Sequence, residues 1–321
     1  MNCIGGFWIA SELSLLAKTR GERFPWSSSR APKRGMAIQQ LLILVLIKGI
    51  LMSITTCAAA LNDQEQIITA YTVSEVQEAL EKIGKDAVIF IDVDDTLITP
   101  KSKSFHSSSP YRFLIDDLKR EREKYKNFEE IISHWRRARK TILVSEDWPG
   151  LISTLKTVHP VYALTKMETG AIGAIPSMER WRHEELTGKG ITFTPTFART
   201  SEMMLVSDSS HTYPASFYKG IFITGSFNKS DVIRAILKME RPSQIVLIDD
   251  RPEYLKDANE ECNRQFLPFL GILFKGMERI LGKPDPAVAE FQKKYLLEHA
   301  EWLEDEEAEE ALRRVKEDLP I

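Results

Sequence analysis

The sequence AVIFIDVDDTL, residues 87–97, joins an apolar run to a cluster of acidic residues, and it decides the fold. The first five residues, Ala87 to Ile91, predict a fully buried strand, because the run is too short for a typical helix. Asp92, Asp94 and Asp95 follow directly. Carboxylates crowded at the end of a buried strand repel one another and lose hydration. A fold tolerates them where a positive charge, usually a metal ion, lies among them.

Two other interpretations of these acidic residues stay open at this point. Aspartate is favoured in turns and at helix N-termini, so the run could simply cap the next element. It could also be a calcium loop, although the Asp/Gly/Glu spacing of an EF-hand is absent. Segments further along the chain must separate these possibilities.

The composition is that of a globular protein. The chain has 321 residues, of which 43% are apolar and 28% charged, enough for a sizeable core. A net charge of −3 without a broad basic tract gives no indication of nucleic acid as a partner. Cys262 is the only cysteine outside the N-terminal region, so no disulfide is expected in the main domain, and no zinc-type Cys/His spacing occurs.

Residues 1–60 are predicted to be an N-terminal extension and a signal peptide. The stretch LLILVLIKGILMSITTCAAAL, residues 41–61, is apolar and ends in small residues, the pattern of a secretory signal. Met36 would be a better start for such a signal than the first residue of the chain. An uncleaved anchor or a buried helix are the alternatives, but Lys48 makes a membrane-spanning helix costly. We therefore expect an exported protein, periplasmic or secreted, that meets the membrane only through its export signal.

Three later segments place polar residues at the ends of regular elements. Val161 to Thr165 (VYALT) is a second apolar run and ends in a hydroxyl residue. Lys229 stands just before a predicted helix over 230–239, which follows a predicted strand over 219–224. A further buried strand, QIVLI at 244–248, delivers Asp249 and Asp250. Ligands of open α/β sheets bind outside the carboxyl ends of the strands, so we expect these residues to converge.

In this order the four motifs resemble those of the haloacid dehalogenase (HAD)-like superfamily, over residues 85–275. The phrases YKGIFITGSFNKSDVI (218–233) and IVLIDDRPEYL (245–255) look like an uncharacterised family of exported HAD-like proteins from host-associated Gram-negative bacteria. The resemblance implies an α/β fold: a three-layer, Rossmann-like HAD core with a parallel sheet and a small helical cap insert.

The resemblance also implies roles for the site residues. Asp92 would attack phosphorus and form an aspartyl-phosphate, and Asp94 would act as general acid and then general base. Thr165 would hydrogen-bond the phosphoryl group, while Lys229 would stabilise its charge and hold Asp92. Phosphoryl transfer needs such a nucleophile, cation and proton donor.

Mg²⁺ is the implied cofactor. Asp92, Asp249, Asp250 and the carbonyl of Asp94 would share the ion, since it prefers oxygen ligands and retained water. Many relatives carry Asn at the position that Tyr254 occupies in this chain.

We therefore expect a Mg²⁺-dependent phosphatase that hydrolyses a small phosphomonoester. The carboxylate of Asp94 favours phosphoryl chemistry, because relatives that cleave carbon–halogen bonds typically lack it. Two alternatives remain: a phosphotransferase that uses the same intermediate, and a catalytically silent exported binding protein with a HAD fold.

The predicted domain boundaries follow from these patterns. Residues 61–284 form the HAD-like core, with a cap insert over about 101–145 whose charged helical segment could fold over the site as a lid. Residues 285–321 form a C-terminal helical extension with no chemistry. A short strand is expected at 191–193 and a loop over 194–216.

Overall fold

The computed structural model describes residues 67–105, 120, 122–280 and 284–317. The chain divides into two units, Met1–Asn62 and Asp63–Ile321. The predicted signal peptide and N-terminal extension, 1–60, lie outside the described residues, and so do residues 106–119 of the predicted cap insert. None of the helices in the described ranges combines the length and the apolarity that crossing a bilayer requires.

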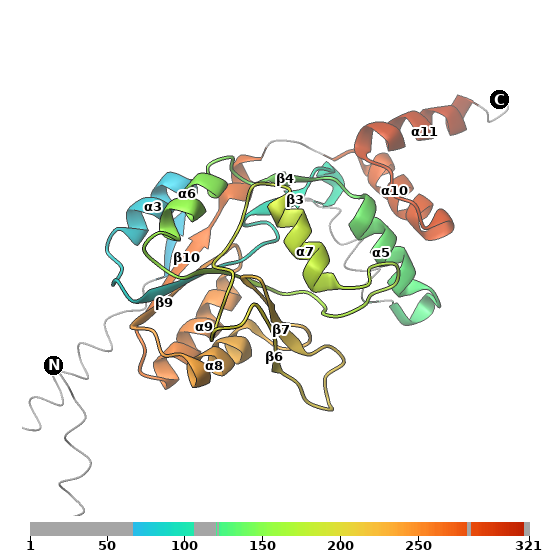
Figure 1. The fold of residues 1–321 in the computed structure, drawn as a ribbon. Coiled ribbons are helices and arrows are strands. Elements are labelled where there is room, and N and C mark those ends of the chain that lie inside the picture. The colour runs from blue at the N-terminus through green and yellow to red at the C-terminus, as the bar shows by residue number, and fades with distance from the viewer. Residues whose placement is uncertain (1–66, 106–119, 121, 281–283, 318–321) are drawn as a thin grey trace, which may run out of the picture. The chain divides into compact units, whose positions relative to one another are not determined.

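An eight-stranded sheet forms the centre of the second unit, in the order β1-β10-β9-β2-β5-β8-β7-β6 (Figure 1). Its strands are β1 (Ile67–Ala70), β2 (Ala87–Ile91), β5 (Val161–Thr165), β6 (Glu202–Val206), β7 (Ala215–Tyr218), β8 (Ile221–Ile223), β9 (Gln244–Asp249) and β10 (Phe269–Phe274). The strands from β1 to β8 in this order pair in parallel, and the hairpin β7–β6 adds an antiparallel edge. Parallel neighbours require crossover connections, which helices supply.

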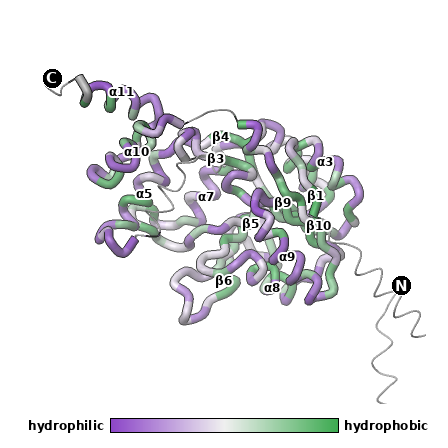
Figure 2. The backbone as a smooth tube through the Cα atoms, turned by 180° about the vertical axis from the view of Figure 1, so that it is seen from behind, coloured by the Kyte–Doolittle hydropathy of each residue, from purple (hydrophilic) through white to green (hydrophobic). Residues whose placement is uncertain are grey.

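Helices cover both faces of the sheet. The helices α3 (Val73–Leu80), α6 (Trp148–Leu155) and α7 (Met178–Thr187) contribute to one apolar cluster, and α8 (Lys229–Met239) and α9 (Pro252–Arg264) to the other. Successive strand residues point to opposite faces, so Ile89 and Ile91 join the first cluster and Phe90 the second. Strands buried on both faces are continuously apolar, as Figure 2 shows for the sheet. The predicted three-layer, Rossmann-like α/β fold is confirmed.

The insert after β2 begins and ends in a small antiparallel pair. Strand β3 (Ile98–Pro100) pairs with β4 (Thr141–Leu143), and between them lie η1 (Lys103–Phe105), η2 (Arg122–Lys124) and α5 (Phe128–Ala138). Helix α5 packs against the C-terminal helix α10 (Pro286–His299) in a core of their own, and α11 (Asp305–Glu317) packs against α10. This core includes Trp135 and Trp302, whose rings meet edge to face at 6.5 Å.

Hydrogen bonds fasten the start of α11 to both ends of the insert. Asp305 accepts from the Ser102 hydroxyl at 2.5 Å and from the backbone N–H of Lys103 at 2.9 Å. Glu304 accepts from the backbone N–H of Lys140 at 2.8 Å and from the Trp302 indole at 3.0 Å. The C-terminal extension and the insert are therefore one packed assembly rather than separate surface elements.

Two local predictions are wrong. Residues 191–193 form no strand, although Ile191 and Phe193 are buried in the core. The expected loop over 194–216 contains β6 and the start of β7. Ser, Thr and Pro around these strands conceal them, and β6 lies at the sheet edge, where its side chains stay exposed or half-buried. Edge strands need little of the apolar continuity that marks a central strand.

Two phenylalanines should differ strongly in how much their substitution changes the free energy of unfolding. Phe222 is fully buried and its ring contacts Phe90, Tyr162 and Phe217, so Phe222→Ala should lower the free energy of unfolding by about 3–5 kcal/mol. Phe266 is 78% exposed, and Phe266→Ala should change it by less than about 0.5 kcal/mol. Denaturant unfolding followed by tryptophan fluorescence measures both. Equal losses would contradict this packing.

Candidate active site

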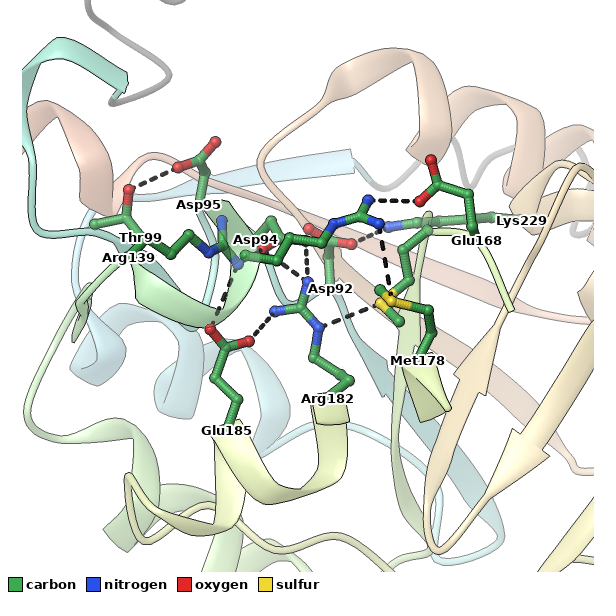
Figure 3. Close-up of polar contacts among 12 residues, drawn as sticks. Asp92, Asp94, Asp95, Thr99, Arg139, Glu168, Met178, Arg182, Glu185 and Lys229 are labelled. Atoms are coloured by element: carbon green, nitrogen blue, oxygen red, sulfur yellow. Dashed lines mark hydrogen bonds and ion pairs between the residues drawn. The ribbon is translucent and has the colours of Figure 1, made fainter. Parts of the chain in front are cut away.

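The turn after β2 sets the direction of the acidic residues. Asp92 donates its backbone N–H to the Ile248 carbonyl at 2.8 Å, which continues the ladder with β9. Asp95 adopts a left-handed conformation, with φ of 66°, which Asp tolerates better than most residues. Its carboxylate accepts from the Thr99 hydroxyl at 2.8 Å (Figure 3). The strand end is therefore a fixed turn, and it separates the side chain of Asp92 from that of Asp94.

Three carboxylates meet at the carboxyl edge of the sheet. Asp92 follows β2, and Asp249 and Asp250 lie at the end of the neighbouring strand β9. One oxygen of each lies within 4.8 Å of the others, and Asp92 and Asp249 are almost fully buried. Sequence reasoning expected these residues to converge, and the parallel register of β2 and β9 brings them together.

Lys229 reaches the same point from the first turn of α8. Its ammonium, on a side chain only 1% exposed, donates to Asp92 Oδ1 and, at 2.5 Å, to Asp249 Oδ2. Burial alone would lower the pKa of Lys229, but Asp249 and Asp92 outweigh burial and raise it, so the side chain stays charged. The ammonium also lies 4.9 Å from the centre of the Tyr254 ring. A cation over an aromatic face is a favourable contact, which gives Tyr254 a role at this position.

The electrostatic balance of the cluster favours a divalent cation. Burial, with help from Asp249 and Asp250, raises the pKa of Asp92 well above its usual range despite Lys229. Burial and the carboxylates of Asp249 and Asp95 raise the pKa of Asp250 to about 7. The ammonium of Lys229 alone therefore does not balance the negative charge of the carboxylates that are ionised. An all-oxygen donor set of this kind suits Mg²⁺, which is held by a few carboxylates and keeps several waters.

Asp94 turns its carboxylate away from this cluster. Arg182 Nη2 donates to its two oxygens at 2.8 and 3.1 Å, and Arg139 Nη2 lies 3.7 Å away (Figure 3). The side chain of Asp94 is therefore absent from the acidic triplet, and any metal contact from this residue would have to come from its carbonyl, as expected.

Sequence reasoning missed both arginines. Arg182 lies between Met178 and Leu186 on the buried side of α7, at helical spacing, so a charge on an apolar stripe was the available signal. Arg139 follows α5 within a strongly charged segment, and nothing in the sequence separates it from its exposed neighbours.

Two threonine hydroxyls lie at the ends of adjacent strands. Thr165 ends β5, and Thr224, which follows β8, donates its backbone N–H to the Thr165 carbonyl at 3.1 Å. Both side chains are buried, and their hydroxyls have no hydrogen-bond partner among the described residues. Buried hydroxyls without partners are costly, so they suit an oxygen-rich ligand. Thr165 was expected at the site, and Thr224 was not.

Comparison with known proteins identifies the family. A family model described as "Protein of unknown function (DUF2608)" matches residues 69–309. The chain belongs to this family. The uncharacterized protein RP296 of Rickettsia prowazekii (strain Madrid E) is 28% identical over 277 residues, which cover 84% of this chain and 99% of that protein. No solved structure matches the chain. Neither description states an activity, so function must follow from the site.

The raised pKa of Asp250 predicts opposite effects of pH on the protein alone and on its binding of Mg²⁺. The folded state holds this proton more tightly than the unfolded state does. Its contribution to stability is therefore complete below the unfolded-state pKa and is lost as pH rises through about 7. Mg²⁺ requires ionised ligands, so binding of the ion at this cluster would strengthen over the same range.

We expect Mg²⁺ to raise the melting temperature more at about pH 8 than at about pH 5.5, as measured by thermal unfolding with and without the ion. Asp250→Asn should remove most of this difference, and Asp257→Asn, at an exposed position of α9, should keep it. A Mg²⁺ effect of the same size at both pH values in the unmodified protein would contradict the site.

Proposed function

We propose that this protein is a HAD-like, Mg²⁺-dependent phosphatase that hydrolyses a phosphomonoester through an aspartyl-phosphate on Asp92. The observation that carries the proposal is the buried contact of Lys229 with Asp92 and Asp249, beside Asp250. The four motifs that resemble those of the HAD-like superfamily lie on neighbouring strands, in the spatial order β9-β2-β5-β8, and every one of these strand ends contributes a polar group. The ligand site expected of open α/β sheets lies at this edge.

Asp92 is suited to the nucleophilic step. Lys229 contacts its Oδ1, so we assign the attack on phosphorus to Oδ2. The bond from Oδ2 to phosphorus forms as the bond to the leaving oxygen breaks, and one hard displacement becomes two easier ones. Bound Mg²⁺, held by Asp92, Asp249 and Asp250, would neutralise charge on the phosphoryl oxygens.

Lys229 and the two threonines suit the charged phosphoryl group. The ammonium is fixed by its two carboxylate partners before any substrate arrives, so it stabilises charge without reorganising. The hydroxyls of Thr165 and Thr224 supply unused donors at the ends of β5 and β8. Together they provide the positioning and charge stabilisation on which phosphoryl transfer mainly depends.

Asp94 suits the proton transfers. It is two residues from the nucleophile, and its side chain is 37% exposed while Arg182 and Arg139 hold its position. In the first step it would give the leaving oxygen a proton taken up from solvent. In the second it would take a proton from the water that attacks phosphorus, as the bond from phosphorus to Asp92 Oδ2 breaks and phosphate leaves.

If the protein were a catalytically silent binding protein, the free-energy cost of burying these charged side chains would have no explanation. Asp92, Asp249 and Lys229 are all nearly removed from water, and the penalty of burying such ions often exceeds the attraction between them. A protein that only binds a partner through its surface has no need of a buried, under-neutralised triplet. A phosphatase uses it to bind Mg²⁺ and to hold the nucleophile.

Phosphate release from an aryl phosphate and a panel of metabolite esters tests the proposal with the full chain. We expect turnover that requires Mg²⁺, stops with a chelator, and falls on the order of 10⁴-fold in Asp92→Asn. Asp257→Asn is the matched control and should retain full activity, because its side chain lies on the exposed face of α9.

Added alcohols separate hydrolysis from transfer, since a phosphotransferase would form new esters at the expense of free phosphate. No turnover on any ester, in folded protein that also fails to bind Mg²⁺, would contradict the phosphatase and favour the binding protein.

A further inference from the structure

Three arginine side chains are buried next to the proposed site. Arg136 lies in α5, Arg139 directly follows this helix, and Arg182 lies in α7. Their side chains are only 8%, 7% and 3% exposed, in that order. Burying a guanidinium is costly unless oxyanions surround it, so this group needs an explanation beyond surface charge.

The acidic partners of these arginines are more exposed than the arginines themselves. Glu168 accepts from Arg136 Nη2 at 2.5 Å, yet its side chain is 34% exposed. Asp94, which Arg182 and Arg139 share, is 37% exposed. The cations are thus the fixed, inner half of each pair. Glu185, which Arg139 and Arg182 share, is only 12% exposed, so Glu168 is the carboxylate that can exchange with another oxyanion without moving an arginine.

Several N–H groups of these guanidiniums lack a strong hydrogen-bond acceptor among the described residues. Arg139 Nε is buried and has no hydrogen-bond partner among the described residues. Arg136 Nη1 lies 3.8 Å from the sulfur of Met178, and Arg182 Nε lies 3.3 Å from the sulfur of Met167. A thioether is a weak hydrogen-bond acceptor. An oxyanion at either position would accept a stronger hydrogen bond from the guanidinium.

We propose that Arg136, with Arg139, binds a second anionic group of the substrate, so that the enzyme acts on phosphomonoesters that also carry a carboxylate or another phosphate. In this account Glu168 occupies the place of that group and is displaced by it. The inference rests on the proposed phosphatase function for the assignment of the first phosphate to the Asp92 site.

The connection through Asp94 places this subsite on the leaving-group side. Arg182 and Arg139 both contact Asp94, the proposed proton donor to the leaving oxygen. Burial lowers the pKa of Arg182, but Asp94, Glu185 and, to a smaller extent, Asp92 raise it. Arg136 lies in the last turn of α5, and Arg139 follows the helix three residues later. An anion attached to the leaving group would therefore meet both.

The balance of charge among these residues favours the replacement of Glu168 by an anionic group of the substrate. Arg136, Arg139 and Arg182 are matched by Asp94, Glu168 and Glu185. When Glu168 leaves, one guanidinium remains without its charge partner. A bidentate carboxylate or phosphate on the substrate restores the balance with geometry that Arg recognises well.

Binding of non-hydrolysable phosphonates tests the subsite without turnover. Calorimetry on the full chain with Mg²⁺ would compare propylphosphonate with two ligands that also have a three-carbon chain, 3-phosphonopropionate and propane-1,3-bisphosphonate. We expect the ligands with a second anion to bind roughly 10- to 100-fold more tightly, the range of charge-assisted hydrogen bonds. The two ligands also show whether carboxylate or phosphate is preferred.

Three variants isolate the cause. Arg136→Met should remove most of the preference and leave the affinity for propylphosphonate within about threefold, a small change on this scale. Arg137→Met, at the exposed neighbouring position, should keep the preference. Glu168→Gln should strengthen binding of the two dianionic ligands, because a charged competitor is gone. This last result keeps the test informative if the first variant fails to fold.

Equal affinity of the unmodified protein for all three ligands, or no binding of any, would overturn the proposal. An equal loss for charged and uncharged tails in Arg136→Met, or weaker binding of the dianionic ligands in Glu168→Gln, would also overturn it and assign these residues a purely structural role. If the preference holds but no ester is hydrolysed, the subsite stands and the phosphatase function fails.

Discussion

The ammonium of Lys229 lies between Asp92 and Asp249, and all three side chains are almost fully removed from water. Such charges persist in a core only where their partners are held in place, since removing one partner leaves an uncompensated ion. The parallel order β9-β2-β5-β8 provides this restraint, because it sets the ends of β2 and β9 side by side and starts α8 after β8. The buried strands, the fixed turn at Asp95 and the Tyr254 ring all maintain this one contact.

The insert and the C-terminal helices connect this site to the rest of the chain. Helix α5 carries Arg136 toward the site, and on its other side it packs with Trp302 and α10. Glu304 and Asp305 hold the two ends of the insert against the start of α11. The position of the arginines thus depends on residues at the far end of the sequence. This dependence gives the C-terminal extension a structural part in the site, which its acidic, solvent-type sequence does not suggest.

Much of the core could be predicted because its signals are local. An apolar run followed by carboxylates occurs at Asp92 and again at Asp249, and parallel strands end at one edge. Arg139 could not be predicted, because its burial arises from packing around the end of α5, whereas Arg182 carried one overlooked signal, its place between Met178 and Leu186 on the buried side of α7. A hydroxyl at a strand end carries no distinguishing pattern of its own: Thr165 was expected because the resemblance includes it, and Thr224 was missed because the resemblance does not. The edge hairpin β6–β7 was missed because polar flanks hide strands that need only one buried side.

The most direct test of the account is chemical capture of the covalent intermediate. The full chain would be mixed briefly with a phosphomonoester and Mg²⁺, quenched, and treated with borohydride, which reduces an aspartyl-phosphate to homoserine; peptide mass spectrometry would then locate the change. We expect homoserine at position 92, dependent on substrate and absent from Asp92→Asn. Turnover of the same ester with unmodified Asp92, or with the label on another carboxylate, would contradict the assignment of Asp92 as nucleophile.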